Sequence, residues 1–110
     1  MSTSVLRPSH PAVRAFVTAV NAHNRDAFRA ALTPDATMSD DGSERDLNEW
    51  TEREIFASNG QMDVQSESAD GLSLTVLYSN DTWGAMPTAW RFTVDESTGR
   101  ISRFETGQAS

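Results

Sequence analysis

The side chains best suited to chemistry in this sequence are carboxylates, and they are concentrated in one stretch. Residues 35–54 hold eight acidic residues and two arginines, a balance of −6 out of a total net charge of −7. Carboxylates can act as general bases. The simpler interpretation is a solvated helix face with acids in its first turn. The eight acids are Asp35, Asp40, Asp41, Glu44, Asp46, Glu49, Glu52 and Glu54.

Other kinds of site find no support in the residue pattern. The chain has no cysteine, and its two histidines, His10 and His23, lack the spacing of metal ligands, so we expect no metal. The sequence contains no serine–histidine–acid arrangement and no glycine-rich phosphate loop. The acidic balance disfavours binding to nucleic acid or to an anionic membrane surface. It also disfavours anionic ligands, so a small ligand should be neutral or cationic.

The length of 110 residues fits a single domain. We expect residues 1–10 to form a loose tail and residues 11–110 to form the domain. No stretch has the pattern of a signal peptide or a membrane span, so the expected location is cytoplasmic. The hydrophobic share of 37% allows a core but limits the size of any internal cavity.

Helices are predicted in the first half of the chain, where apolar residues recur at helical spacing. Asn24 is placed to cap the second helix, and Asp46 with Glu49 three residues later forms a capping box for the third. Thr33-Pro34 ends the second helix, because the residue before a proline avoids the helical region. The predicted helices cover residues 11–23, 25–32 and a third segment from residue 46 to a stop before Asn59.

The second half changes to alternation with a period of two, which is typical of strands. Asp70-Gly71 is a strong hairpin signal, and Pro87 indicates an edge position or a bulge. Segregated helices and strands predict an α+β fold, in which a curved antiparallel sheet wraps around the helices and can leave a pocket between the layers. The predicted strands cover residues 36–39, 62–69, 72–80, 83–94 and 100–106, with a turn over 40–43.

This order of elements resembles the nuclear transport factor 2-like superfamily, which includes ketosteroid isomerases and SnoaL-like polyketide cyclases. Asp35-Ala36-Thr37, with Asp40 three residues later, is similar to a segment of the isomerase branch, and Gly99-Arg100-Ile101 is also typical. The resemblance runs from Pro11 to the end of the chain. It implies a cone, or cystatin-like α+β barrel, with a pocket at one end and a homodimer formed through the outer face of the sheet. These motifs mark a fold better than a function.

The resemblance assigns roles to three positions. In the isomerase branch the residue that matches Asp40 is the general base. The branch's phenolic oxyanion donor falls at Phe16, and its acidic donor falls at Thr88. The base is therefore present, while both donors are replaced. Losing one such donor costs roughly two to three orders of magnitude in rate, which argues against ordinary steroid-isomerase chemistry. The alternative for Asp40 is a solvated turn aspartate.

Apolar and aromatic residues could line the cavity of such a cone, although each of them would also serve as ordinary core. The segment over residues 81–88 is either a pocket rim with Trp83 as a lid or an irregular sheet edge. The candidate lining residues are Phe16, Val20, Met38, Trp50, Phe56, Met86, Thr88, Trp90 and Phe104.

Two functions are consistent with these observations. The first is a cofactor-independent enzyme in which Asp40 moves a proton on a neutral, mainly apolar substrate during isomerisation or cyclisation. The second is a non-catalytic ligand-binding or dimerisation module of the same fold. No cofactor is expected, because the carboxylate and the substrate would carry the chemistry.

Overall fold

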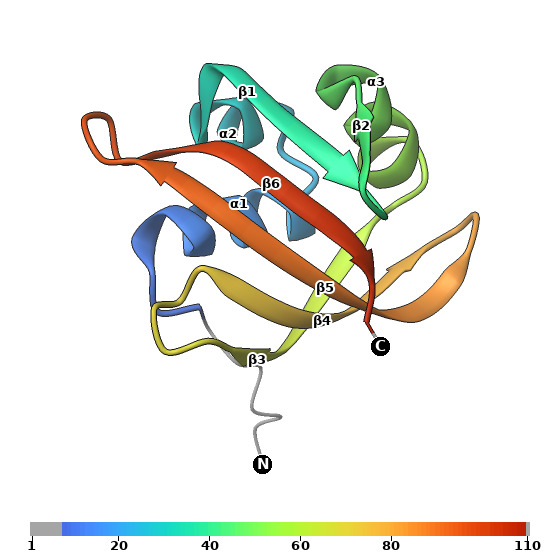
Figure 1. The fold of residues 1–110 in the computed structure, drawn as a ribbon. Coiled ribbons are helices and arrows are strands. Elements are labelled where there is room, and N and C mark those ends of the chain that lie inside the picture. Colours follow the sequence, from blue (N-terminus) through green and yellow to red (C-terminus); the bar gives the residue numbers. More distant parts are fainter. Residues whose placement is uncertain (1–7, 110) are drawn as a thin grey trace.

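Helices and strands follow one another in the predicted order in the computed structural model, which describes residues 8–109 (Figure 1). The predicted loose tail lies mostly in residues 1–7, which are outside the described residues. The helical segments are α1 (Pro11–Asn21), α2 (Arg25–Ala30), α3 (Leu47–Thr51) and the π-helix η1 (Glu52–Phe56). The strands are β1 (Leu32–Asp40), β2 (Ser43–Arg45), β3 (Gln61–Glu67), β4 (Ser73–Asn80), β5 (Gly84–Asp95) and β6 (Arg100–Gln108).

Polar side chains cap α1, α2 and α3, and Asn24 and Asp46 do so where the sequence predicts. His10, Asn24 and Asp46 each accept a hydrogen bond from a backbone N–H in the first turn of α1, α2 and α3. α1 ends at Asn21, two residues before its predicted end, and His23 adopts a left-handed backbone with φ of 53°. No helix in residues 8–109 combines the length and hydropathy needed to cross a membrane.

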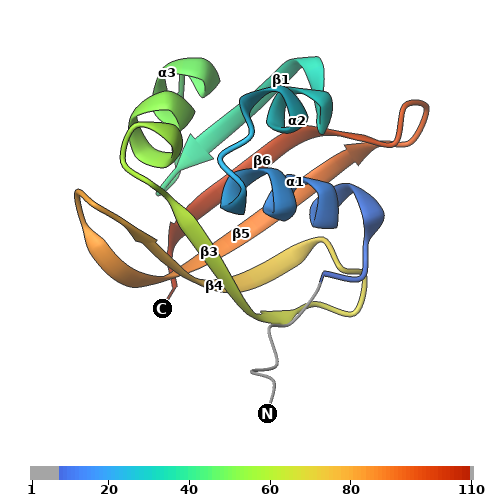
Figure 2. The same cartoon turned by 180° about the vertical axis from the view of Figure 1, so that it is seen from behind.

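The six strands form one mixed sheet in the order β2-β1-β6-β5-β4-β3. The prediction of a wholly antiparallel sheet is wrong in one pair, because β1 runs parallel to β6. All other neighbours are antiparallel. The sheet is curved but open, with β2 and β3 as its edges, so it does not close into a barrel (Figure 2).

The first strand differs most from its prediction. It begins at Leu32, which the sequence predicts in the second helix, and it ends at Asp40, which the sequence predicts in a turn. Ala31 already accepts a hydrogen bond from the backbone of Ile101 on β6, and this long-range pairing overrides the local helical preference. The register against β6 shifts between Leu32 and Thr37, around Pro34. The sequence does not predict the short strand β2, whose first residue, Ser43, falls in the predicted turn.

The helices lie against the concave face of the sheet, with α1 across its middle (Figure 2). Phe16 on α1 is the centre of the core, and it is fully buried. Its ring centroid lies 5.0–6.0 Å from the centroids of Phe28, Trp90, Phe92 and Phe104. The prediction of an α+β fold with a curved sheet around the first helix is confirmed.

The hairpin between β4 and β5 extends past the end of β6 (Figure 1). Pairing between β5 and β6 starts at Thr88, whereas β4 pairs with β5 from Gly84 onward without a register shift. Pro87 therefore lies in a stretch with a ladder partner mainly on one side, which confirms its predicted edge position.

Candidate functional site

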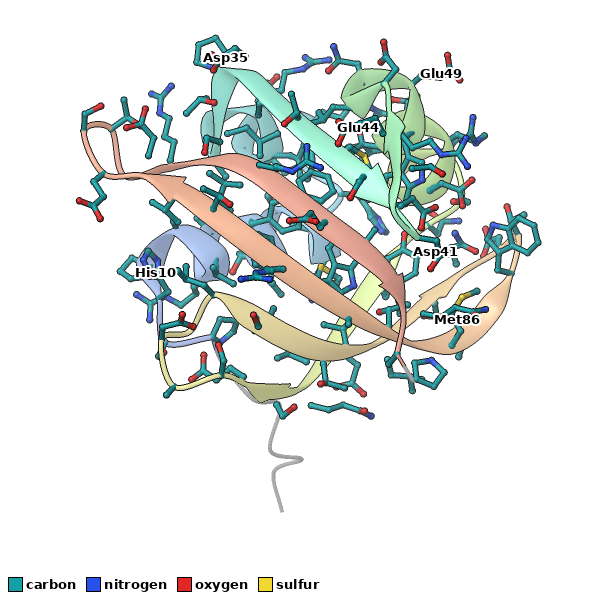
Figure 3. The ribbon with its side chains drawn as sticks, in the orientation of Figure 1. His10, Asp35, Asp41, Glu44, Glu49 and Met86 are labelled. Carbon is teal, nitrogen blue, oxygen red and sulfur yellow. The ribbon has the colours of Figure 1, made fainter. Side chains whose placement is uncertain are left out.

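A cavity of about 430 Å³ opens at the end of the sheet where β1 and β6 finish and β5 begins. One wall comes from α3 and η1, and the others come from β1, β4, β5 and β6. Figure 3 shows Asp41 and Met86, which belong to this cavity, on the opposite side of the view from His10. Its buried or partly buried lining comprises Asp40, Glu54, Trp50, Tyr78, Met86, Thr88, Trp90, Thr106 and Gly107, and its exposed rim comprises Asp41, Arg45, Arg53, Trp83 and Gln108.

Asp40 is the last residue of β1, and the parallel pairing with Thr106 of β6 fixes its position. Its side chain is partly buried. The Oδ2 atom accepts a hydrogen bond from Trp50 Nε1 at 3.1 Å. Within residues 8–109, neither an ion-pair partner for Asp40 nor a hydrogen bond to its Oδ1 is found. The carboxylate therefore offers the cavity a strong acceptor.

The hydroxyl of Thr88 is already engaged within the protein. Thr88 Oγ1 donates to Val76 O at 2.9 Å and accepts from Trp90 Nε1 at 2.9 Å. A hydroxyl has a single proton, so Thr88 has no donor left for a ligand in this arrangement. Thr88 could therefore act as an oxyanion donor only if its hydrogen bond to Val76 O were broken.

Tyr78 and Trp83 direct their polar atoms to Glu54. The Tyr78 hydroxyl donates to the Glu54 backbone carbonyl at 2.5 Å, and Asn80 Nδ2 donates to the same oxygen at 2.9 Å. Trp83 Nε1 donates to Glu54 Oε1 at 2.9 Å. The Glu54 carbonyl lies in η1, a π-helical turn in which the Ala57 N–H donates to Glu52 O at 2.7 Å.

Tyr78 was not predicted as a site residue. Burial of its side chain raises the pKa of the Tyr78 phenol well above its ordinary value, partly opposed by the hydrogen bond with Asn80. The alternation along β4 places Tyr78 on the inner face, with Leu74 and Val76. That signal identifies a buried residue, but it does not tell which inner positions face open space.

Charged side chains surround the mouth. Arg53 forms ion pairs with Glu54 at 2.9 Å and with Glu49 at 3.3 Å. The hydrogen bond that Arg53 donates to Glu54 raises the pKa of the Arg53 guanidinium above its ordinary value. Arg45 also lines the rim, and it has no ion-pair partner in the described part of the chain. Trp83 is 63% exposed at this rim, as a lid residue would be.

Asp41 fastens the turn after β1 to the end of β6. Its N–H donates to Thr106 O at 2.9 Å, and its Oδ1 accepts from Gln108 N at 3.0 Å. A Cβ on Gly107 would lie 2.6 Å from that Oδ1 atom, so the carboxylate needs a glycine beneath it. Asp41 has φ of 50°, a conformation that aspartate tolerates better than most residues. Its role in the site is therefore positional.

The structure brings together five of the predicted site residues and separates the others. Four form part of the buried core instead of this cavity, because aromatic rings fill the interior beneath it. Phe56 lines a different hollow of about 300 Å³ between α2, β1 and α3. The five cavity residues are Asp40, Trp50, Met86, Thr88 and Trp90, and the four core residues are Phe16, Val20, Met38 and Phe104. Within residues 8–109, no group of three His, Asp or Glu side chains is arranged to hold a metal.

Comparison with known proteins identifies the fold. No protein-family model matches the sequence, and no curated protein matches it. A protein from Sinorhizobium meliloti that is assigned as a polyketide cyclase is 21% identical over 86% of this chain and 92% of its own, with a TM-score of 0.70. The Δ5-3-ketosteroid isomerase of a Mycobacterium species is 13% identical over 92% of both chains, with a TM-score of 0.68. A computationally designed 17-OHP binder is 12% identical over 91% of this chain and 89% of its own, with a TM-score of 0.72.

Proposed function

We propose that this chain, which has the nuclear transport factor 2-like fold, binds a small and mainly apolar molecule in the Asp40 cavity. Asp40 would accept a hydrogen bond or a proton from that molecule. The observation that carries the proposal is one carboxylate, held by Trp50 through a single oxygen, at the side of a cavity that four aromatic residues also line. A volume of about 430 Å³ is within the range of small-molecule sites.

Similar structures support both a catalytic and a binding version of the proposal. An isomerase and a designed ligand binder share the fold, so the fold alone does not choose between them. In the catalytic version Asp40 removes a proton from a carbon next to a carbonyl, and the resulting oxyanion needs a hydrogen-bond donor. Phe16 and Thr88 do not supply one, which leaves Thr106 in the lining and Arg45 and Gln108 at the rim.

The binding version is favoured by how the lining uses its polar groups. The indole and phenol donors of the four lining aromatic residues all point to protein acceptors. A ligand therefore meets ring surfaces and the Asp40 carboxylate inside a charged rim, and none of these ring donors is free to bind it. Proton abstraction needs more than this, so catalysis is the second candidate.

One probe tests both versions. We expect 4-phenylbutan-2-one to change the tryptophan fluorescence in a saturable way, because all three tryptophans of the chain line the cavity. Exchange of its hydrogens next to the carbonyl, followed by proton NMR in D₂O, reports proton abstraction. In the catalytic version Asp40→Asn slows the exchange by at least a hundredfold and leaves binding in place.

The outcomes separate the alternatives. Saturable binding without enhanced exchange supports the non-catalytic version. Enhanced exchange that survives in Asp40→Asn rules out this aspartate as the base. A probe that fails to perturb any tryptophan contradicts the proposal of a binding cavity. Trp83→Phe is the matched control, because it keeps an aromatic lid while removing the bond to Glu54.

A further inference from the structure

Beside the aromatic rings of the cavity, the free polar group is the acceptor of Asp40. Trp50 Nε1 occupies Asp40 Oδ2, and Oδ1 has no hydrogen-bond partner among residues 8–109. Trp83, Tyr78 and Trp90 donate their protons to Glu54 and Thr88. A ligand that brings its own donor can therefore satisfy Oδ1, whereas a ligand with acceptors alone would depend on Thr106 in the lining or on Arg45 and Gln108 at the rim.

The aromatic walls favour a positive charge on that donor. The rings of Trp50 and Trp90 are 6.4 Å apart between centroids and inclined at 70°, and Tyr78 and Trp90 are 5.9 Å apart and inclined at 49°. These rings pack against one another at an angle, and all three also border the cavity. Their electron-rich faces attract organic cations within about 6 Å of a ring centroid.

The charges around the mouth of the cavity also favour a positively charged ligand. Asp40, Asp41 and Glu54 give three carboxylates on the lining, against the two guanidinium groups of Arg45 and Arg53. Arg53 is neutralised further by Glu49, which lies next to it outside the lining. The surplus is negative, and it adds to the acidic balance of the stretch from 35 to 54.

Desolvation of Asp40 strengthens the preference for a cationic ligand over a neutral one. Asp40 is partly buried before any ligand enters. A neutral apolar ligand would remove the remaining water from the carboxylate and give nothing back, which is costly for a charged group. A protonated amine would replace that water with a charge-assisted hydrogen bond.

We propose that the cavity binds an organic cation, in which an apolar body carries a protonated amine that pairs with Asp40. The amine donates to Oδ1 while the apolar body lies against the aromatic walls. This inference rests on the proposed function, because it names the ligand class of the same cavity.

Four probes with one body test the charge. We compare 4-phenylbutylamine with 4-phenylbutan-1-ol, with 4-phenylbutyrate and with the N-acetylated amine, which keeps an N–H but loses its charge. Affinities come from tryptophan fluorescence titrations at neutral pH. The amine should bind at least tenfold more tightly than the alcohol, the acetylated amine should resemble the alcohol, and the carboxylate should bind most weakly.

Variants locate the preference. Asp40→Asn should lower the affinity for the amine to that for the alcohol and leave the affinity for the alcohol unchanged. Asp63→Asn is the matched control, because it removes the same charge from an exposed position on β3 that does not line the cavity. It should keep the tenfold ratio. If Asp40→Asn does not fold, the comparison of the amine with its acetylated form on the unmodified chain carries the same test.

Equal affinities for amine and alcohol on the unmodified chain would overturn the inference and leave the proposed function standing. A preference for the amine that survives in Asp40→Asn would overturn it as well, because the charge would be recognised elsewhere. Failure of all four probes to bind would contradict the proposed function itself.

Discussion

Asp40 differs from the other acids of its stretch in what surrounds it. Four of those acids form ion pairs with arginines. Asp46 caps a helix, and Asp41 fastens a turn. Asp40 instead receives an indole N–H and faces a cavity. The interpretation of the stretch as a solvated, charge-paired face therefore explains most of its acids, and Asp40 is the partly buried one whose carboxylate keeps a free oxygen in the cavity. The paired acids are Glu44, Glu49, Glu52 and Glu54.

Tyr78 provides a prediction about pH. Because burial raises the pKa of this phenol, the folded chain keeps the proton to a higher pH than the unfolded chain does. The contribution to stability is fully present below the ordinary value of about 10 and is lost as the pH rises above it. Tyr78 is the single tyrosine of the chain, so its absorbance can be titrated without interference from others. We expect ionisation to begin only as the protein unfolds.

Tyr78→Phe is the control for this prediction. The unfolding free energy from urea titrations should fall less steeply between pH 9 and about 11 in the variant than in the unmodified chain. At neutral pH the variant should lose about 1 kcal/mol, because Asn80 still donates to the Glu54 carbonyl. A tyrosine that titrates near 10 in the folded protein would contradict the account of its burial.

At the scale of elements, the turn between β1 and β2 decides where Asp40 lies. Asp41 holds this turn to β6 through Thr106 and Gln108. We expect Asp41→Ala to lower the unfolding free energy by about 2 kcal/mol, because it removes a hydrogen bond and leaves a residue with a Cβ in a left-handed conformation. Hydrogen exchange at the Gln108 amide should speed up with it.

Asp41→Asn is the matched variant, since asparagine keeps an acceptor and tolerates the same backbone. It should change stability by no more than about 0.5 kcal/mol. If both variants behaved alike, the bond from Gln108 would not be what holds the turn, and the account of this element would fail.

Elements that depend on neighbouring residues can be predicted from the sequence, whereas pairings between distant segments cannot. Caps such as Asn24 and the hairpin at Asp70-Gly71 depend on residues a few positions apart, so local pattern predicts them. The parallel pairing of β1 with β6 joins residues more than sixty positions apart, and no local signal encodes it. For the same reason the sequence predicts Asp40 in a turn, although it is the last residue of β1.

At the scale of the whole molecule, the interior of the cone is filled by aromatic rings around Phe16. Helical and strand periodicity predicts Phe16 and Phe104 as cavity residues, but both lie in this filled interior and do not line the cavity. Periodicity tells which side chains face inward, but the presence of open space depends on how all of them pack. Trp50 and Trp90 are indistinguishable from core residues by pattern, and only the fold places them beside Asp40.

Phe16→Tyr tests this interpretation of the core. The added hydroxyl would enter a fully buried ring cluster without a partner, so we expect the unfolding free energy to fall by about 1–3 kcal/mol. It should not create hydrogen exchange on 4-phenylbutan-2-one, because the position does not line the cavity. A variant of unchanged stability with new exchange activity would mean that the ring reaches the site after all.

The homodimer through the outer sheet face stays a prediction. The outward side chains of β5 include Arg91 and Thr93, and those of β6 include Arg103 and Glu105, so this face is largely polar. Light scattering coupled to size exclusion at high protein concentration measures the mass directly. A value twice the 12.1 kDa of one chain supports the dimer, and a value equal to one chain contradicts it.

The binding cavity itself is tested most directly by the indole N–H signals in a ¹H–¹⁵N NMR titration. The chain has three tryptophans, all of which line the cavity with their N–H groups held by Asp40, Glu54 and Thr88. On titration with neutral 4-phenylbutan-1-ol, we expect all three signals to move with one common affinity. In Asp40→Asn without the probe, we expect the chemical shift of the Trp50 signal alone to differ from that of the unmodified chain. Three stationary indole signals at saturating probe would contradict a ligand site beside Asp40.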